Sequence, residues 1–268
     1  SSDLAMVIDP DSPDFVTSFA RGLSVISCFG EQAVALTLAE VAERTSLTRP
    51  TARRFLLTLV SLGYVRTDGK RFWLSPKTLE LGYAYLSSMA IADIVNTSMQ
   101  HLVELLNESC AMAVLDGMES VYVARVRPRH SMYLQVDVGE RQPLYCTSTG
   151  RVLLAAMEPE QVDAYLGQIE RPALTRYTIT DETELRKTLR EVGISGYALI
   201  DQEVELGLRA IAVPVHAKSG KVVAGVSVGT HTGRASKEDI IKKILPPLRD
   251  CAREIEGVLI RSDSIIGR

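Results

Sequence analysis

The fold is decided by residues 37–64, which read TLAEVAERTSLTRPTARRFLLTLVSLGY. Thr37 and Glu40 have the spacing of a capping box, in which a hydroxyl and a carboxylate satisfy each other's backbone amides at a helix start. Thr48, a second candidate for an N-cap, stands before the helix-forming run from Arg49 to Leu62, and a glycine ends that run. The stretch therefore predicts two short helices joined by a turn.

The second of these helices separates its apolar residues from its basic ones. At about 100° per residue, the face expected to be buried holds Ala52, Phe55, Leu56, Leu59 and Leu62. Three arginines gather in the first turns, at positions 49, 53 and 54. The second helix of a helix-turn-helix enters the major groove of DNA with its N-terminal residues, and arginine binds guanine edges or phosphates there. This arrangement indicates a recognition helix.

The flanking segments complete a winged module. An amphipathic segment precedes the pair, Val16 to Phe29, and we expect its Phe19, Leu23, Ile26 and Phe29 to face inward. After the pair, residues 64–74 predict a hairpin around Asp68-Gly69, the residues of a two-residue type I′ turn. The residues expected to contact DNA are Arg21, Thr48, Arg49, Pro50, Thr51, Arg53, Arg54, Lys70 and Arg71.

The charge is distributed unevenly along the 268 residues. The whole chain has a formal net charge of −3. Residues 15–75 hold eight Lys or Arg against four Asp or Glu, a net charge of +4, so the remainder carries −7. A basic head on an acidic body predicts a polyanionic partner for the head only.

Several classes of protein are disfavoured. No apolar run approaches the roughly 18 residues of a membrane span, and the acidic start lacks the features of a signal peptide. We expect a cytoplasmic protein that makes no membrane contact, with a disordered tail over 1–14. Cys28, Cys110, Cys146 and Cys251 form no CxxC pair, and the four histidines have no metal-binding spacing. The sequence predicts reduced thiols, no metal and no cofactor.

The chain divides into a winged helix-turn-helix domain over 15–75, a linker helix over 76–90 and a larger domain over 91–268. In the larger domain we expect strands at 111–115, 120–127, 132–138, 199–203, 210–216 and 222–229. The expected helices lie at 91–108, 148–157, 159–166, 181–192 and 236–261. Strands first and last with helices between them predict an α+β domain with an antiparallel sheet.

Several of these segments resemble the IclR family of bacterial transcription regulators. The matching stretches include Leu47 to Leu56, Pro143-Leu144 through Gly150 to Ala155, and Glu203 to Val215. The double arginine before Phe55 and the stretch Leu79 to Leu86 are most similar to the branch that controls aromatic-acid catabolism through the β-ketoadipate pathway. The resemblance implies a GAF-like effector-binding domain and an assembly of dimers, or of dimers paired into tetramers.

A small acid has a candidate site in the larger domain. Residues 145–150, YCTSTG, form a hydroxyl-rich loop that runs into a helix, and the free amides of a helix start attract carboxylates. The resemblance implies that this loop acts together with the closing strands. The residues expected to bind an effector are Tyr145, Thr147, Ser148, Thr149, Gly150, Asp201, Arg209 and Ser227. Alternatively, Ser148 or Thr149 only caps the helix, and Arg209 pairs with Glu203 or Glu205.

We therefore predict a sequence-specific, DNA-binding transcription regulator on a palindromic operator, controlled by a small organic acid from aromatic catabolism. An alternative is a metabolite-sensing adaptor that acts through protein contacts rather than DNA. The residues Gly225-Val226-Ser227-Val228-Gly229 also fit GxSxG, the nucleophile motif of hydrolases. That motif needs a turn from strand to helix at the serine, whereas here a strand is expected to continue, so we expect no enzyme.

Overall fold

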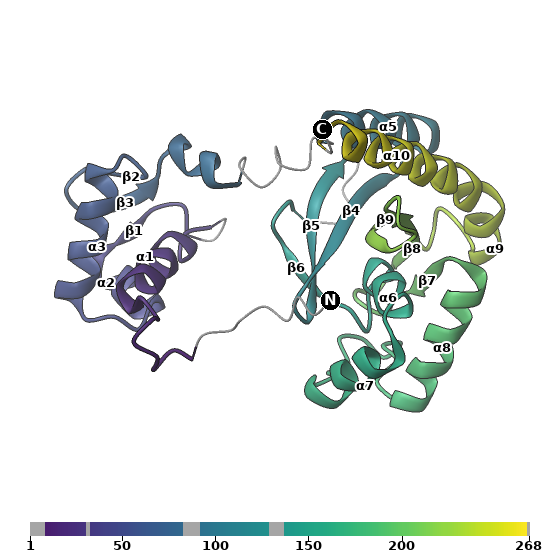
Figure 1. Ribbon diagram of the computed structural model, residues 1–268, viewed down its shortest axis with the longest axis horizontal. Coiled ribbons are helices and arrows are strands. Elements are labelled where there is room, and N and C mark those ends of the chain that lie inside the picture. Colours follow the sequence, from purple (N-terminus) through teal and green to yellow (C-terminus); the bar gives the residue numbers. More distant parts are fainter. Residues whose placement is uncertain (1–8, 31–32, 83–91, 129–136, 267–268) are drawn as a thin grey trace. The chain divides into compact units, whose positions relative to one another are not determined.

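The computed structural model describes residues 9–30, 33–82, 92–128 and 137–266. The chain forms two compact units, residues 1–85 and 86–268, each with its own core (Figure 1). Part of the tail expected to be disordered (1–8), most of the strand expected at 132–138 and residues 83–90 of the expected linker helix lie outside the described residues.

The first unit begins with three helices, and the second and third of them start at the N-caps expected from the sequence. They are α1 (Thr17–Ser27), α2 (Leu38–Arg44) and α3 (Arg49–Ser61). The Glu40 carboxylate accepts the backbone N–H of Thr37 at 2.7 Å, and the Thr37 hydroxyl accepts the N–H of Glu40 at 3.4 Å. At α3, the Thr48 hydroxyl accepts the N–H of Thr51 at 3.4 Å. Both predicted N-caps are confirmed.

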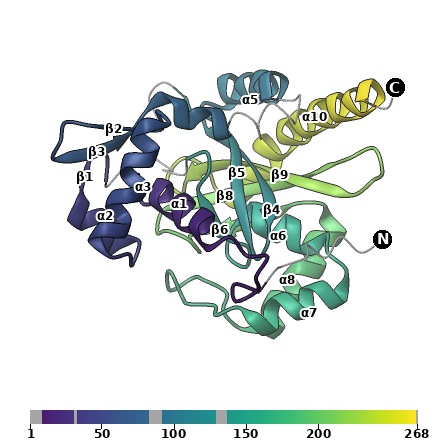
Figure 2. The ribbon, with the colours of Figure 1, turned by 60° about the vertical axis from the view of Figure 1, so that its left-hand side comes forward.

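The sheet of the first unit has one more strand than expected. Its strands β1 (Leu36–Thr37), β2 (Val65–Thr67) and β3 (Arg71–Leu74) are antiparallel in the order β1-β3-β2. Figure 2 shows β2 and β3 as a hairpin, and the prediction of a type I′ turn there is wrong. That turn requires a positive φ at both central residues. Of the pair, only Gly69 has one, at 91°.

The Asp68 side chain instead organises a longer turn. Its Oδ1 accepts the backbone N–H groups of Lys70 and Arg71 at 2.9 and 2.8 Å. The carboxylate therefore accepts hydrogen bonds from backbone N–H groups that, in a two-residue turn, would be available for pairing between the strands.

The buried face of α1 agrees with the expected one in part, since Phe29 is buried and Ile26 is partly buried against the core. Phe19 is 67% exposed and Leu23 is 46% exposed, whereas Val25 is fully buried. The helix packs on α3 along the face of Gly22 and Val25, and a Cβ at Gly22 would stand 3.9 Å from the ring of Phe55. The packing face is therefore rotated away from Phe19 and Leu23 and toward Gly22 and Val25.

The second unit is built on a six-stranded antiparallel sheet in the order β6-β5-β4-β9-β8-β7. Its strands are β4 (Ser109–Asp116), β5 (Glu119–Val126), β6 (Arg141–Pro143), β7 (Ala198–Asp201), β8 (Leu208–His216) and β9 (Val222–His231). Helices α5 (Ala92–Leu106) and α10 (Leu245–Ile266) cover one face, and α6 (Ser148–Ala155) lies on the other (Figure 1). Helices α7 (Pro159–Gln168) and α8 (Glu182–Ser195) complete the α6 side. This confirms the expected α+β class.

The two faces of this sheet carry side chains of different size. Toward α5 and α10 the central strands present Cys110, Met112, Val226, Val228 and Ile211, which form the main core. Toward α6 the alternate positions hold Ala111, Ala113, Ala210, Ser227 and Gly229. Because successive side chains on a strand point to opposite faces, the small residues lie together and leave space on the α6 side.

Some elements differ from the sequence-based expectation. The single helix expected at 236–261 is divided into α9 (Lys237–Asp239), a π-helical turn (Ile240–Ile244) and α10. The segment after β3, still within the first unit, begins with a 3₁₀ turn, Pro76–Thr78, and continues as helix over 79–82. Within the described residues, no helix is both long and apolar enough to cross a membrane.

Candidate functional site

The basic residues of α3 are displayed on the surface of the first unit. Arg49, Arg53 and Arg54 are all exposed, and none of them forms an ion pair with another described residue. Their helix is anchored from behind, because Ala52 and Leu56 are fully buried in the core of the unit. A helix whose first turns expose basic side chains and whose opposite face is apolar and buried has the geometry of a recognition helix.

The other residues expected at DNA lie on α1, at the start of α3 and in the wing. Arg21 on α1 and Pro50 in the first turn of α3 are exposed, as are Lys70 and Arg71 at the turn between β2 and β3. The Thr48 hydroxyl lies 2.8 Å from that of Thr51, so both belong to the cap of α3. Each hydroxyl sits at the end of the helix from which a phosphate would approach.

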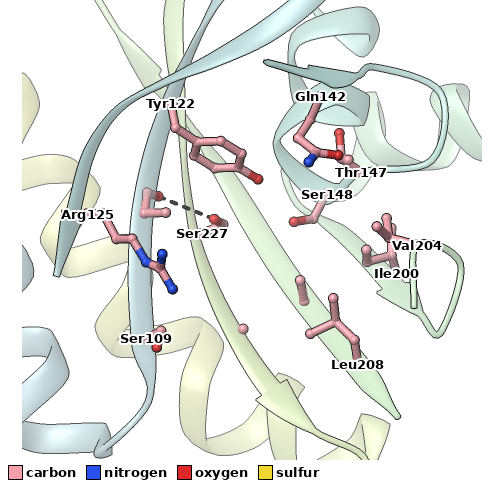
Figure 3. A pocket seen from close by; sticks show the side chains of 13 residues that line it. Ser109, Tyr122, Arg125, Gln142, Thr147, Ser148, Ile200, Val204, Leu208 and Ser227 are labelled. Atoms are coloured by element: carbon pink, nitrogen blue, oxygen red, sulfur yellow. Dashed lines mark hydrogen bonds between the residues drawn. The ribbon is translucent and has the colours of Figure 1, made fainter. Parts of the chain in front are cut away.

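A pocket opens on the α6 side of the sheet in the second unit (Figure 3). Its floor consists of the small residues Ala111, Ala210, Ser227 and Gly229. Apolar side chains of Ile200, Val204 and Leu208 form one wall. Polar side chains surround the rest: Ser109, Tyr122, Arg125, Gln142, Thr147 and Ser148. Such an apolar cavity with a few converging polar groups is typical of a small-molecule site.

A shift in strand register places Tyr122 and Arg125 in the same pocket. Residues three apart on a regular strand point to opposite faces. Here Tyr122 pairs with Ala113 and Arg125 pairs with Ala111, and the register shifts between Met112 and Ala113. The extra residue on β5 restores both side chains to the face of Ala111 and Ala113.

The pocket is cationic at one point and otherwise neutral. Among its lining residues, all of them described, Arg125 alone bears a full charge. Its side chain is 5% exposed, and its Nη1 lies 3.1 Å from Oδ1 of Asp137. Burial is the main cause that lowers the pKa of Arg125, although a guanidinium stays protonated in proteins. Burial also raises the pKa of Tyr122, which keeps that hydroxyl protonated as a hydrogen-bond donor.

The start of α6 brings two of the expected residues into the pocket and directs others elsewhere. The Thr147 hydroxyl accepts the N–H of Gly150 at 3.1 Å and donates to the Pro143 carbonyl at 2.8 Å. Ser148 points into the pocket (Figure 3). Thr149 instead packs on β9, since its Cα would stand 3.3 Å from a Cβ at Gly225. The hydroxyl of Tyr145 donates to the Pro172 carbonyl at 2.7 Å.

Asp201 and Arg209 form an ion pair outside the pocket lining. Arg209 Nε lies 2.7 Å from Asp201 Oδ1, and Lys237 Nζ lies 2.9 Å from Oδ2 of the same carboxylate. Arg209 also donates to the Ala235 carbonyl at 2.8 Å. The expected pairing of Arg209 with Glu203 or Glu205 is wrong, because Glu203 is turned inward onto a different arginine, Arg151.

Of the residues expected to bind an effector, Thr147, Ser148 and Ser227 line the pocket. Tyr145, Thr149, Gly150, Asp201 and Arg209 do not. Sequence reasoning missed four polar lining residues, Ser109, Tyr122, Arg125 and Gln142. One signal was present: β4, β8 and β9 each alternate small with large residues, as in Gly225-Val226-Ser227-Val228-Gly229. Three such strands side by side indicate a hollow face.

The GxSxG letters are explained by this alternation. Ser227 lies within β9, between Ala111 of β4 and Ala212 of β8, and its hydroxyl donates to the Ala111 carbonyl at 3.2 Å. The strand runs on to His231, so the strand-to-helix turn of a nucleophile elbow does not occur at this serine. In the part of the chain that the structure describes, no cluster of three or more His, Cys, Asp or Glu could hold a metal.

The fold and its two sites define a class of protein, a transcription regulator with a DNA-binding winged helix-turn-helix and a ligand-binding domain. Matches to models of protein families identify the family within this class. Residues 18–69 match the IclR helix-turn-helix domain, and residues 83–257 match the C-terminal domain of bacterial transcriptional regulators of the IclR type. The chain belongs to the IclR family.

Relatives with assigned roles place the chain in the aromatic-catabolism branch of that family, as expected. It is 41% identical to the Pca regulon regulatory protein of Pseudomonas putida, over 91% of this chain and 84% of that protein. It is 36% identical to the p-hydroxybenzoate hydroxylase transcriptional activator of Acinetobacter baylyi, over 92% and 93%. These relatives are transcription regulators rather than enzymes.

A solved structure is similar over both units. An IclR homologue from Microbacterium hydrocarbonoxydans, crystallised with 4-hydroxybenzoate, matches with a TM-score of 0.81 and 25% identity, over 90% of this chain and 98% of that one.

Proposed function

We propose that this regulator senses a small aromatic acid in the pocket of its second unit and that the bound acid changes its affinity for an operator. The observation that carries the proposal is Arg125, a buried cation in a pocket whose other lining residues are uncharged. A buried guanidinium in such a site favours an anion, and the small floor with apolar walls suits a flat ring.

The relatives support an aromatic acid over other anions. The Acinetobacter relative activates transcription for p-hydroxybenzoate hydroxylase, and the Microbacterium homologue binds 4-hydroxybenzoate. Thr147, Ser148 and Ser227 are the residues from the sequence-based set that we assign to the effector, together with Tyr122 and Arg125.

On the DNA side, we propose that the start of α3 reads the major groove and that Lys70 and Arg71 hold phosphates from the wing. We further propose a homodimer, or a tetramer of paired dimers, on a palindromic operator in the cytoplasm. A dimer places two recognition helices on half-sites about one helical turn of DNA apart. An effector changes operator affinity only insofar as it prefers one state of the protein.

Fluorescence polarisation tests both parts of the proposal. The full chain is titrated onto labelled DNA from upstream of its own gene and onto random DNA of equal length, over a salt series. Benzoate, hydroxybenzoates and aliphatic dicarboxylates are added in turn. We expect selective, salt-dependent binding that shifts with an aromatic acid. Equal binding to both DNAs under every condition would overturn the DNA assignment, and a response to dicarboxylates alone would overturn the aromatic effector.

A further inference from the structure

The polar groups of the pocket lie at two levels along the strands. Arg125 stands opposite Ala111, and Tyr122 stands opposite Ala113. These levels are two residues apart, roughly 6.6 Å at 3.3 Å per residue. Figure 3 shows the guanidinium of Arg125 and the hydroxyl of Tyr122 both directed into the pocket from these different levels.

Ser109 adds to the Arg125 end. It lies on β4 two residues before Ala111, on the same face, so it continues the line beyond Arg125 and away from Tyr122. The Ser109 hydroxyl is buried and has no hydrogen-bond partner among the described residues. A buried hydroxyl left unpaired costs free energy that a bound carboxylate oxygen would recover.

The opposite end holds neutral hydroxyls. Tyr122 is 8% exposed and Ser148 is 4% exposed, and both line the pocket. Along the floor between Ser109 and Tyr122 lie Ala111 and Ser227, and the Ser227 hydroxyl is already engaged with the Ala111 carbonyl. The middle of the pocket therefore offers a flat surface with little unused hydrogen-bonding capacity.

We propose that this pocket distinguishes aromatic acids by the position of their second polar group. Arg125 and Ser109 hold the carboxylate, and Tyr122 with Ser148 hold a hydroxyl on the opposite carbon of the ring. A para substituent lies on the far side of the ring from the carboxylate and reaches the second level. An ortho substituent lies beside the carboxylate and does not reach the level of Tyr122 and Ser148. This inference rests on the proposed function, since it concerns the same pocket.

Isothermal titration calorimetry on the full chain tests the proposal with benzoate, 2-hydroxybenzoate and 4-hydroxybenzoate. We expect 4-hydroxybenzoate to bind the native protein more tightly than the other two. Tyr122→Phe should reduce the affinity for 4-hydroxybenzoate about 3- to 10-fold, the range of one hydrogen bond, and leave the affinity for benzoate within about 2-fold. Ser148→Ala should act in the same direction. Tyr197→Phe, which removes a hydroxyl on the other side of the sheet, is the matched control and should change neither affinity.

The outcomes distinguish an error in the proposed effector class from an error in the inference about the position of the hydroxyl. If none of the three acids binds the native protein, the proposed effector class is wrong. If they bind and Arg125→Gln weakens all of them, the effector class stands. The positional inference is then overturned by either of two results: 2-hydroxybenzoate binding as tightly as 4-hydroxybenzoate, or Tyr122→Phe weakening benzoate and 4-hydroxybenzoate equally. The ratio of two affinities in one variant is insensitive to a general loss of folded protein, so a partly unfolded variant does not confuse the result.

Discussion

Arg151 and Glu203 form a bidentate ion pair inside the second unit, with Nη1 2.6 Å from Oε1 and Nη2 2.5 Å from Oε2. Their side chains are 1% and 6% exposed. Arg151 also donates from Nε to the Tyr145 carbonyl, and Glu203 accepts the backbone N–H of Ile179. The pair therefore joins α6, whose start carries Ser148, to the loop that carries Val204 on the opposite wall of the pocket.

Removing one member of this pair should destabilise the second unit severely. Glu203→Leu leaves the Arg151 guanidinium buried without a counterion, and we expect a loss of about 3 to 5 kcal/mol in the free energy of unfolding. Urea denaturation measures it. The control is Arg141→Met, which breaks exposed pairs with Asp116 and Glu119 and should cost at most about 1 kcal/mol. Similar losses in both variants would contradict a special role for the buried pair.

Gly150 should be intolerant of any side chain, although it carries no positive φ. A Cβ there would stand 2.4 Å from the Cα of Leu144, a backbone atom that cannot move aside cheaply. We expect Gly150→Ala to lower the midpoint of thermal unfolding strongly or to prevent folding. Gly167, in α7, has nothing within 4 Å of the same position, and alanine there should stabilise by about 0.5 to 1 kcal/mol. Differential scanning calorimetry measures the unfolding midpoint of both variants. A Gly150→Ala protein that unfolds at the midpoint of the native protein would refute the steric argument.

Asp201 should contribute to stability in a pH-dependent way. Burial raises its pKa, but hydrogen bonds from Arg209 and Lys237 outweigh burial, and the net pKa is lowered. A carboxylate with a lowered pKa in the folded state stabilises above its unfolded pKa of about 3.9, and the contribution is lost as the pH falls through the lower folded value. We expect Asp201→Asn to be less stable than the native protein at pH 7, with the difference shrinking below about pH 4.

The same variant tests whether Asp201 binds the effector. Because its carboxylate lies outside the pocket lining, Asp201→Asn should leave the affinity for an aromatic acid within about 2-fold, about 0.4 kcal/mol. A large loss of affinity in a protein that remains folded would indicate that Asp201 contacts the effector.

The arginines of α3 should affect operator binding in two distinguishable ways. An arginine that binds a phosphate should, when changed to alanine, reduce the salt slope by about 1 and weaken all DNAs alike. Changing an arginine that reads a base to alanine should weaken the free energy of operator binding by about 1 to 3 kcal/mol and relax specificity at one base position. Arg53→Ala and Arg54→Ala are measured by fluorescence polarisation over a salt series. Arg190→Ala, at an exposed site in the second unit, is the control, and if it weakened binding equally the effect would be one of general charge.

Features that depend on neighbouring residues were predictable from the sequence. The capping box of Thr37 and Glu40 and the cap at Thr48 involve contacts over three residues, and both occur as expected. The limits of this reasoning appear at α1. The 3.6-residue period of Phe19 and Leu23 identifies a helix, but packing against the core of the unit, where Val25 is buried, decides which of its faces is covered.

The sequence by itself determined the two-part organisation, the recognition helix and the α+β class, because helix periodicity, strand alternation and caps act over a few residues. Only the tertiary structure decided the pocket. Ser227 meets Ala111 across two strands that are far apart in the chain, and Arg125 joins Tyr122 on one face only because the register shifts between Met112 and Ala113. A single inserted residue reverses every side chain beyond it, and strand pairing over long separations fixes where that happens.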